Sequence, residues 1–198
     1  MRNSVRQSMM LISIIIFPIL FSYACAQQGQ TESGDAEFYF NRGVASYEKG
    51  QYDQAISEFT KAIEIDPKDA EAYKDRGDTY ELKGQYDRAI SDYNKAIEID
   101  PKVALAYNNL AWILATVKTS RLRNGKKAVE LALKACELSN WEDPDYLDTL
   151  AAAYARVGDF NNAVKWQAKA LESPELAKNT EAQQRFKFYK ERKPWPAD

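Results

Sequence analysis

Apolar and polar side chains along residues 36–177 follow the spacing of amphipathic helices. In the stretch from residue 52 to residue 65, apolar side chains fall at Ala55, Phe59 and Ala62, with intervals of three and four residues. Residues at these intervals lie on one face of a helix, whereas a strand would need alternation with a period of two. The same spacing returns 34 residues later. The pattern therefore predicts a series of helices, each with one buried face.

The chain repeats itself at a fixed period. Residues 36–69 and 70–103 match at 21 of 34 positions without a gap. Each copy holds two helical patterns separated by the sequence Lys-Gly-Gln-Tyr-Asp, whose glycine favours the end of the first helix. Pro67 and Pro101 then close the copies, because proline lacks the amide hydrogen that a helix needs and disfavours helix in the preceding residue. Such identity at a fixed period indicates repeated structural units.

These units resemble the tetratricopeptide-repeat family, which places aromatic residues at positions 4 and 24, small residues at 8, 20 and 27, and proline at 32. The first unit supplies Tyr39, Gly43, Ala55, Phe59, Ala62 and Pro67, and the second supplies Tyr73, Gly77, Ala89, Tyr93, Ala96 and Pro101. The resemblance implies an all-α fold, a right-handed superhelical array of antiparallel helix pairs, or α-solenoid. Arg42 and Arg76 depart from it, since position 7 is usually leucine. We expect their stems to cover apolar surface and their guanidinium groups to reach water.

Further units follow with weaker patterns. Residues 104–143 form a third unit whose turn is five residues longer, so that Val117 to Gly125 is expected to be an extended basic loop. Residues 144–177 form a fourth unit, which lacks the late proline. Residues 178–198 are expected to hold a polar capping helix, Thr180 to Lys193, and an extended tail, because an array needs a cap over its last apolar face. The prediction is about four units plus a C-terminal capping helix.

The N-terminal 26 residues have the features of an export signal. Arg2 and Arg6 precede an apolar run, which is too short to cross a membrane comfortably and is disturbed by Pro18. Cleavage after residue 26 predicts a protein exported to the periplasm or cell envelope, with residues 27–35 as a flexible tether. In the alternative, Cys25 is lipidated and anchors the chain to a membrane, although Ser22 and the bulky Tyr23 depart from a lipidation motif. A retained membrane anchor is the third alternative.

Composition argues against catalysis. The chain has no histidine, so the commonest general base and metal ligand is absent. It has two cysteines, Cys25 and Cys136, with no paired metal-ligand spacing, and it has no glycine-rich phosphate loop. Cys136 aligns with apolar positions and is expected to be a buried hydrophobe. With 27 basic and 29 acidic residues, nothing points to nucleic acid. We expect no enzyme activity, no cofactor and no metal.

The resemblance also implies where a partner binds. In this family the first helices of successive units line a concave side that holds peptide segments. Positions 2, 5, 9 and 12 of those helices share a stripe. From that stripe we select aromatic, apolar and charged side chains as groove candidates: Phe40, Val44, Tyr47, Lys74, Asp78, Asn108, Trp112 and Asp148. Aromatic anchors would supply binding energy and charges would fix register.

The expected function is therefore a scaffold or adaptor of the cell envelope that binds a protein or peptide partner. One alternative is a self-associating or lipid-anchored component of a secretion, pilus or outer-membrane machine, in which the chain forms homo-oligomers. Another is that the aromatic stripe packs internally, since such stripes are often core.

Overall fold

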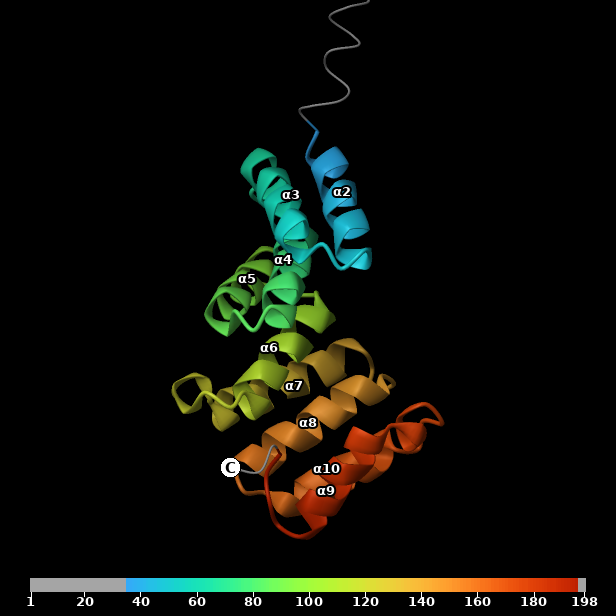
Figure 1. Cartoon of the computed structure of the whole chain (residues 1–198). Coiled ribbons are helices and arrows are strands. Elements are labelled where there is room, and N and C mark those ends of the chain that lie inside the picture. Colours follow the sequence, from blue (N-terminus) through green and yellow to red (C-terminus); the bar gives the residue numbers. More distant parts are fainter. Residues whose placement is uncertain (1–34, 196–198) are drawn as a thin grey trace, which may run out of the picture.

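The computed structural model describes residues 35–195, and within them the regular elements are helices packed as consecutive antiparallel pairs (Figure 1). The helices are α2 (Ala36–Glu48), α3 (Tyr52–Ile65), α4 (Ala70–Leu82), α5 (Tyr86–Ile99), α6 (Ala104–Thr116), α7 (Gly125–Leu138), α8 (Pro144–Arg156), α9 (Phe160–Ala170) and α10 (Thr180–Lys190). This confirms the predicted α-solenoid of four helix pairs and a C-terminal helix. The expected signal segment, Cys25 and most of the tether lie outside the described residues.

Short polar side chains and glycines set the helix ends. The carboxylate of Asp69 accepts a hydrogen bond from the amide of Ala72 at the start of α4, and Asp143 and Asn179 cap α8 and α10 in the same way. These caps satisfy amides that have no partner within the helix. Gly84, after α4, has a φ of 69°, in the left-handed region that glycine adopts without strain. The sequence therefore fixes each turn locally.

Two glycines allow the paired helices to approach closely. A Cβ atom placed on Gly43 would lie 2.5 Å from the ring of Phe59, and one on Gly77 would lie 2.8 Å from the ring of Tyr93. Both distances are shorter than carbon atoms tolerate. The small residue at position 8 and the aromatic at position 24 are therefore one packing contact, between the first and second helix of a unit.

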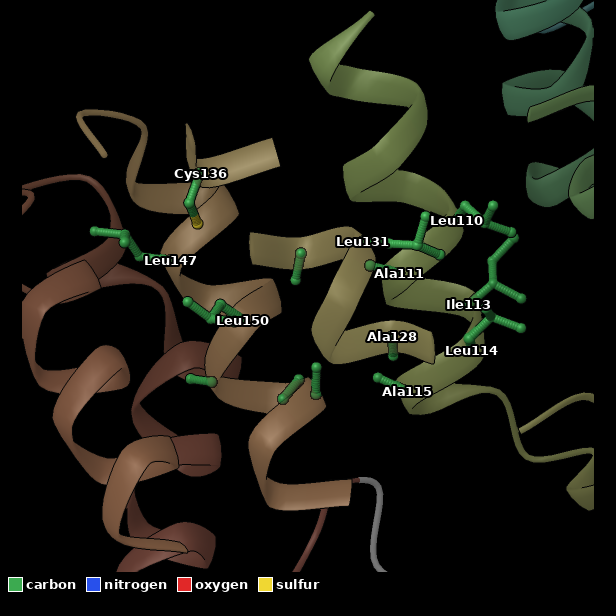
Figure 2. Packing of buried hydrophobic residues seen from close by; sticks show 14 of the residues in the cluster. Leu110, Ala111, Ile113, Leu114, Ala115, Ala128, Leu131, Cys136, Leu147 and Leu150 are labelled. Atoms are coloured by element: carbon green, nitrogen blue, oxygen red, sulfur yellow. The ribbon is translucent and has the colours of Figure 1, made fainter. Parts of the chain in front are cut away.

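The largest core lies where α6, α7 and α8 meet (Figure 2). Leu110 and Ile113 of α6 and Leu150 of α8 are almost fully buried there, among many alanines. Each such side chain contributes about 1.5–3 kcal/mol by leaving water. Cys136 of α7 is fully buried in the same cluster, and burial raises the pKa of its thiol to about 12. The thiol is packed as a small hydrophobe.

One of the two position-7 arginines behaves differently from the prediction. The guanidinium of Arg76 donates two hydrogen bonds to the carboxylate of Asp92, at 2.8 and 2.9 Å, and its side chain is only 15% exposed. Arg42 pairs with Glu58 at 3.0 Å and is 46% exposed. Only Arg42 reaches water as expected. In both units the pair ties the first helix to the second, which compensates for the missing leucine.

The basic loop of the third unit is also more compact than predicted. It contains a short 3-10 helix, Ser120–Leu122. Arg121 donates to both carboxylate oxygens of Asp87, at 2.8 and 2.6 Å, and Arg123 donates to the backbone carbonyls of Val117 and Lys118. The loop folds because its arginines find acceptors on the preceding unit and on the loop itself.

Candidate functional site

Three hollows follow one another along α2, α4 and α6. The first, of about 230 Å³, is lined by Val44, Tyr47 and Asp78 among others. Tyr47 and Asp78 also line the second, of about 470 Å³. Glu81 and Tyr86 then link the second hollow to the third, of about 580 Å³. Because neighbouring hollows share lining residues, they form one string, which we call the groove. Its main lining residues are Val44, Tyr47, Asp78, Glu81, Tyr86, Asn109, Trp112 and Trp195.

Four of the eight predicted residues line this groove. They are Val44 and Tyr47 of α2, Asp78 of α4 and Trp112 of α6. Their spacing by 34 residues between successive units brings them to the same side of the array. A role in binding a partner stays a prediction for each of them.

The other four lie elsewhere. The ring of Phe40 packs at 5.7 Å from the ring of Phe59, next to the small core between the first two units. Lys74 is held in ion pairs with carboxylates of its own helix. Asn108 is buried and donates to the side chain of Asn109. Asp148 is buried beneath α10. These four residues thus belong to the first helices α2, α4, α6 and α8 but do not line the hollows.

Several groove residues were absent from the prediction. Tyr86 begins α5, a second helix, and therefore fell outside the stripe of first-helix positions. Asn109 stands one residue after a stripe position, and its side-chain amide donates to Asp78 at 2.8 Å. A tyrosine stands at position 17 in both of the first two units, as Tyr52 and Tyr86, and this repetition was the signal that could have drawn attention to Tyr86. Trp195 carried no signal, because only the tail's path brings it here.

The middle of the groove carries two carboxyl groups around one phenol. The hydroxyl oxygen of Tyr93 lies 2.7 Å from Asp78 Oδ1 and 2.8 Å from Glu81 Oε2. A phenol donates one hydrogen, so two such close contacts are best satisfied when one carboxyl carries a proton. Burial raises the pKa of Glu81 to about 7, and the nearby charge of Asp78 adds to the effect. Burial also raises the pKa of Asp78. Below about pH 7, Glu81 is therefore expected to hold a proton.

The C-terminal helix covers the far end of the first-helix face. Arg185 of α10 donates two hydrogen bonds to Asp148 of α8, at 2.7 and 3.1 Å, and both side chains are buried. The guanidinium carbon of Arg185 lies 5.2 Å from the ring centre of Trp112. The side chain of Gln167 donates to Asp148 as well. Asp148 thus holds the cap in place.

The described residues offer neither a metal cluster nor a membrane span. Across residues 35–195, no group of three or more His, Cys, Asp or Glu side chains is arranged to hold a metal ion. In the same range, no helix has both the length and the apolar content that crossing a bilayer requires. The arrangement that remains is a hollowed, partly aromatic and partly acidic surface.

Comparison with known proteins agrees with the repeat assignment. Family models described as tetratricopeptide or TPR repeats match residues 43–84, 70–103 and 92–128. These matches support the tetratricopeptide-repeat family for this chain. A search of curated protein sequences gave no match.

Solved structures show the same fold at low identity. A MamA protein is 23% identical with a TM-score of 0.64, covering 79% of this chain and 81% of that one. Pseudomonas aeruginosa PilF is 22% identical with a TM-score of 0.65, covering 79% and 69%. YrrB, described as a TPR protein with an unusual peptide-binding site, is 22% identical with a TM-score of 0.66, covering 84% and 81%. At these identities the likeness shows the fold alone.

Proposed function

We propose that the chain is a non-catalytic protein-interaction module of the bacterial cell envelope that binds a peptide segment of a partner in the groove. The observation that carries this proposal is the continuity of the three hollows along α2, α4 and α6, through the shared residues Tyr47, Asp78, Glu81 and Tyr86. An extended segment of several residues needs such a row of adjoining hollows, whereas a small substrate needs one enclosed pocket. Stacked helical repeats commonly use extended concave surfaces of this kind.

The lining suits a segment with both apolar and polar side chains. The rings of Tyr47, Tyr86 and Trp112 offer large rigid contact areas with polar edges, and such residues often dominate binding energy. Asp78 and Asn109 offer hydrogen-bonding groups between them. YrrB, one of the solved structures with this fold, is described as peptide-binding, which is a property of that protein and support by analogy here.

The test is site-specific photocrosslinking in the native host. A photoreactive phenylalanine analogue at Tyr47 is expected to capture a defined partner, and the same analogue at the exposed Ser91 of α5 serves as the control. The captured segment, made as a synthetic peptide, should then bind the purified chain in calorimetry. Tyr47→Ala should weaken that binding about tenfold or more, as loss of an aromatic anchor does. Equal capture from both positions, or an unchanged affinity, would contradict the proposal.

The envelope location rests on the N-terminal signal pattern in the sequence. PilW, another protein with this fold at 21% identity, is described as a type IV pilus biogenesis factor. Intact-mass measurement of the native protein tests the location. A chain that begins at Gln27 supports a soluble envelope protein, a lipid-bearing Cys25 supports the anchored alternative, and an unprocessed Met1 contradicts export.

A further inference from the structure

The chain reverses direction directly after α10. Arg192 has a φ of 58°, which residues other than glycine seldom adopt. The amide of Lys193 donates to the carbonyl of Phe188 at 2.9 Å, and that of Arg192 donates to Tyr189 at 3.0 Å. This pair of hydrogen bonds is the Schellman arrangement, which satisfies the last carbonyls of a helix. The turn sends the following residues back toward the C-terminal end of α8 (Figure 1).

Trp195 is tied down at the end of that path. Its carbonyl accepts a hydrogen bond from Arg156 Nη2 at 3.1 Å, and Arg156 Nε donates to the carbonyl of Ala115 at 2.7 Å. The ring of Trp195 meets the ring of Phe188 edge to face, with 5.4 Å between the centres. One arginine at the end of α8 therefore links the tail to the last turn of α6.

This tail forms part of the wall of the groove. Trp195 lines the hollow of about 580 Å³ together with Trp112 and Glu81. Glu181 of α10 lines the same hollow. The first two hollows, at α2 and α4, have no lining residue from the C-terminal segment. The chain's own C-terminal segment therefore forms part of the groove wall at the C-terminal end and none of it at the N-terminal end.

We propose that Trp195 is a displaceable wall of the third hollow, and that a partner segment competes with the C-terminal segment 192–195 for the surface beside Trp112. This inference rests on the proposed groove function, because it assigns the groove an intramolecular competitor.

The contacts that hold the segment suit a competitor better than a permanent part of the core. Trp195 is half-buried, and Glu191, Arg192 and Lys193 are exposed. By contrast, Arg185 and Tyr189 on α10 are buried, whereas the segment after α10 is held at the surface by the ring contact of Trp195 with Phe188, the hydrogen bond from Arg156 and the contact of Arg192 with the ring of Phe160. A short tether gives the tail an effective concentration on the order of millimolar. At that effective concentration the tail excludes a weakly binding ligand, whereas a tightly binding ligand displaces it.

The first experiment needs no partner. In the full chain labelled with ¹⁵N, each of the four tryptophans gives one indole N–H signal. Trp195→Ala should remove one signal and shift that of Trp112, because a neighbouring aromatic ring has left the hollow. Trp141→Ala is the matched control, because Trp141 stacks on Trp166 and lines none of the groove hollows. It should leave the Trp112 signal in place.

A second variant releases the tail without removing its tryptophan. Proline cannot adopt the positive φ of residue 192, so Arg192→Pro should break the turn while α10 stays folded. It should shift the Trp112 signal in the same direction as Trp195→Ala. A Trp112 signal that neither variant moves overturns the proposal.

The binding experiment uses the chain's own end as the probe. A fluorescent peptide with the sequence of residues 187–198 is titrated into the full chain and into the Trp195→Ala and Trp141→Ala variants. Trp195→Ala should bind it about tenfold more tightly than the other two, since its groove end is vacant. Equal affinity for all three, or no binding to Trp195→Ala, overturns the proposal. Neither experiment uses the Tyr47 crosslink, so the proposed function and this inference can fail separately.

Discussion

Breaking the ion pair between Arg185 and Asp148 by removing one partner is expected to destabilise the C-terminal cap strongly. The two side chains are 5% and 8% exposed and share two hydrogen bonds. Arg185→Ala leaves the Asp148 carboxylate buried without its counter-ion, with Gln167 as its remaining donor. Removing one partner of a buried pair costs about 3–5 kcal/mol, a large share of the roughly 5–15 kcal/mol by which domains are stable.

The exposed pair of Arg121 and Asp87 provides a matched control. It too has two hydrogen bonds, but its side chains are 65% and 60% exposed. Water screens such pairs, so Arg121→Ala should cost far less stability than Arg185→Ala. A double variant, Asp148→Asn with Arg185→Met, removes both buried charges and keeps an acceptor for Gln167. It should recover most of the stability lost in Arg185→Ala, because no charge is left unpaired.

Urea unfolding followed by circular dichroism at pH 7 measures all three variants. The slope of the transition must be fitted with the midpoint, because an array of repeats can lose cooperativity when one end is weakened. A free-energy loss for Arg185→Ala below about 1 kcal/mol, or one equal to that of Arg121→Ala, would refute the reasoning. Trp112 fluorescence should also change in Arg185→Ala, because the guanidinium leaves its ring.

Three further predictions concern single residues. Gly77→Ala should destabilise the chain by about 1–3 kcal/mol in urea unfolding, since its new methyl would meet the ring of Tyr93, and an unchanged midpoint would disprove the close contact. Glu81 has a pKa of about 7 in the folded chain, against an ordinary value of 4.5. The folded state therefore holds more protons than the unfolded state between these two pH values, and the free energy of unfolding should fall as the pH rises across that range. Glu81→Gln should flatten that fall of up to about 3 kcal/mol, whereas the exposed Glu64→Gln should keep it. Cys136 should react with a thiol reagent only as the chain unfolds, because it is fully buried and burial raises its pKa to about 12, and fast labelling of the native protein would contradict its place in the core.

The pattern of residues was sufficient to predict the helix pairs. The period of 34 residues, the glycine after each first helix and the small and aromatic residues at fixed positions all act within one unit. Gly77 and Tyr93, for example, lie in the two helices of one pair, and their contact follows from the geometry of that pair. Local rules of this kind are visible in a sequence, because spacing along a helix decides which residues share a face.

The residues of the groove were predictable from the sequence only in part. Position in the repeat predicted Val44, Tyr47, Asp78 and Trp112, since equal positions in successive units lie on one side of the array. It failed for Asp148, because the repeat pattern does not include the cap that covers this residue.

Only the tertiary structure decided the contacts between those elements that depart from the repeat. Arg185 reaches Asp148 across 37 residues, and Arg156 reaches Trp195 across 39. Both depend on where the chain turns after α9 and α10, and no periodicity governs those turns. A charge or an aromatic ring in a sequence has many possible partners, and the free energy of desolvation selects one only when the surrounding helices are in place. The sequence by itself therefore determined the array, and the packing of its last helix and tail determined which part of the groove wall the C-terminal segment forms.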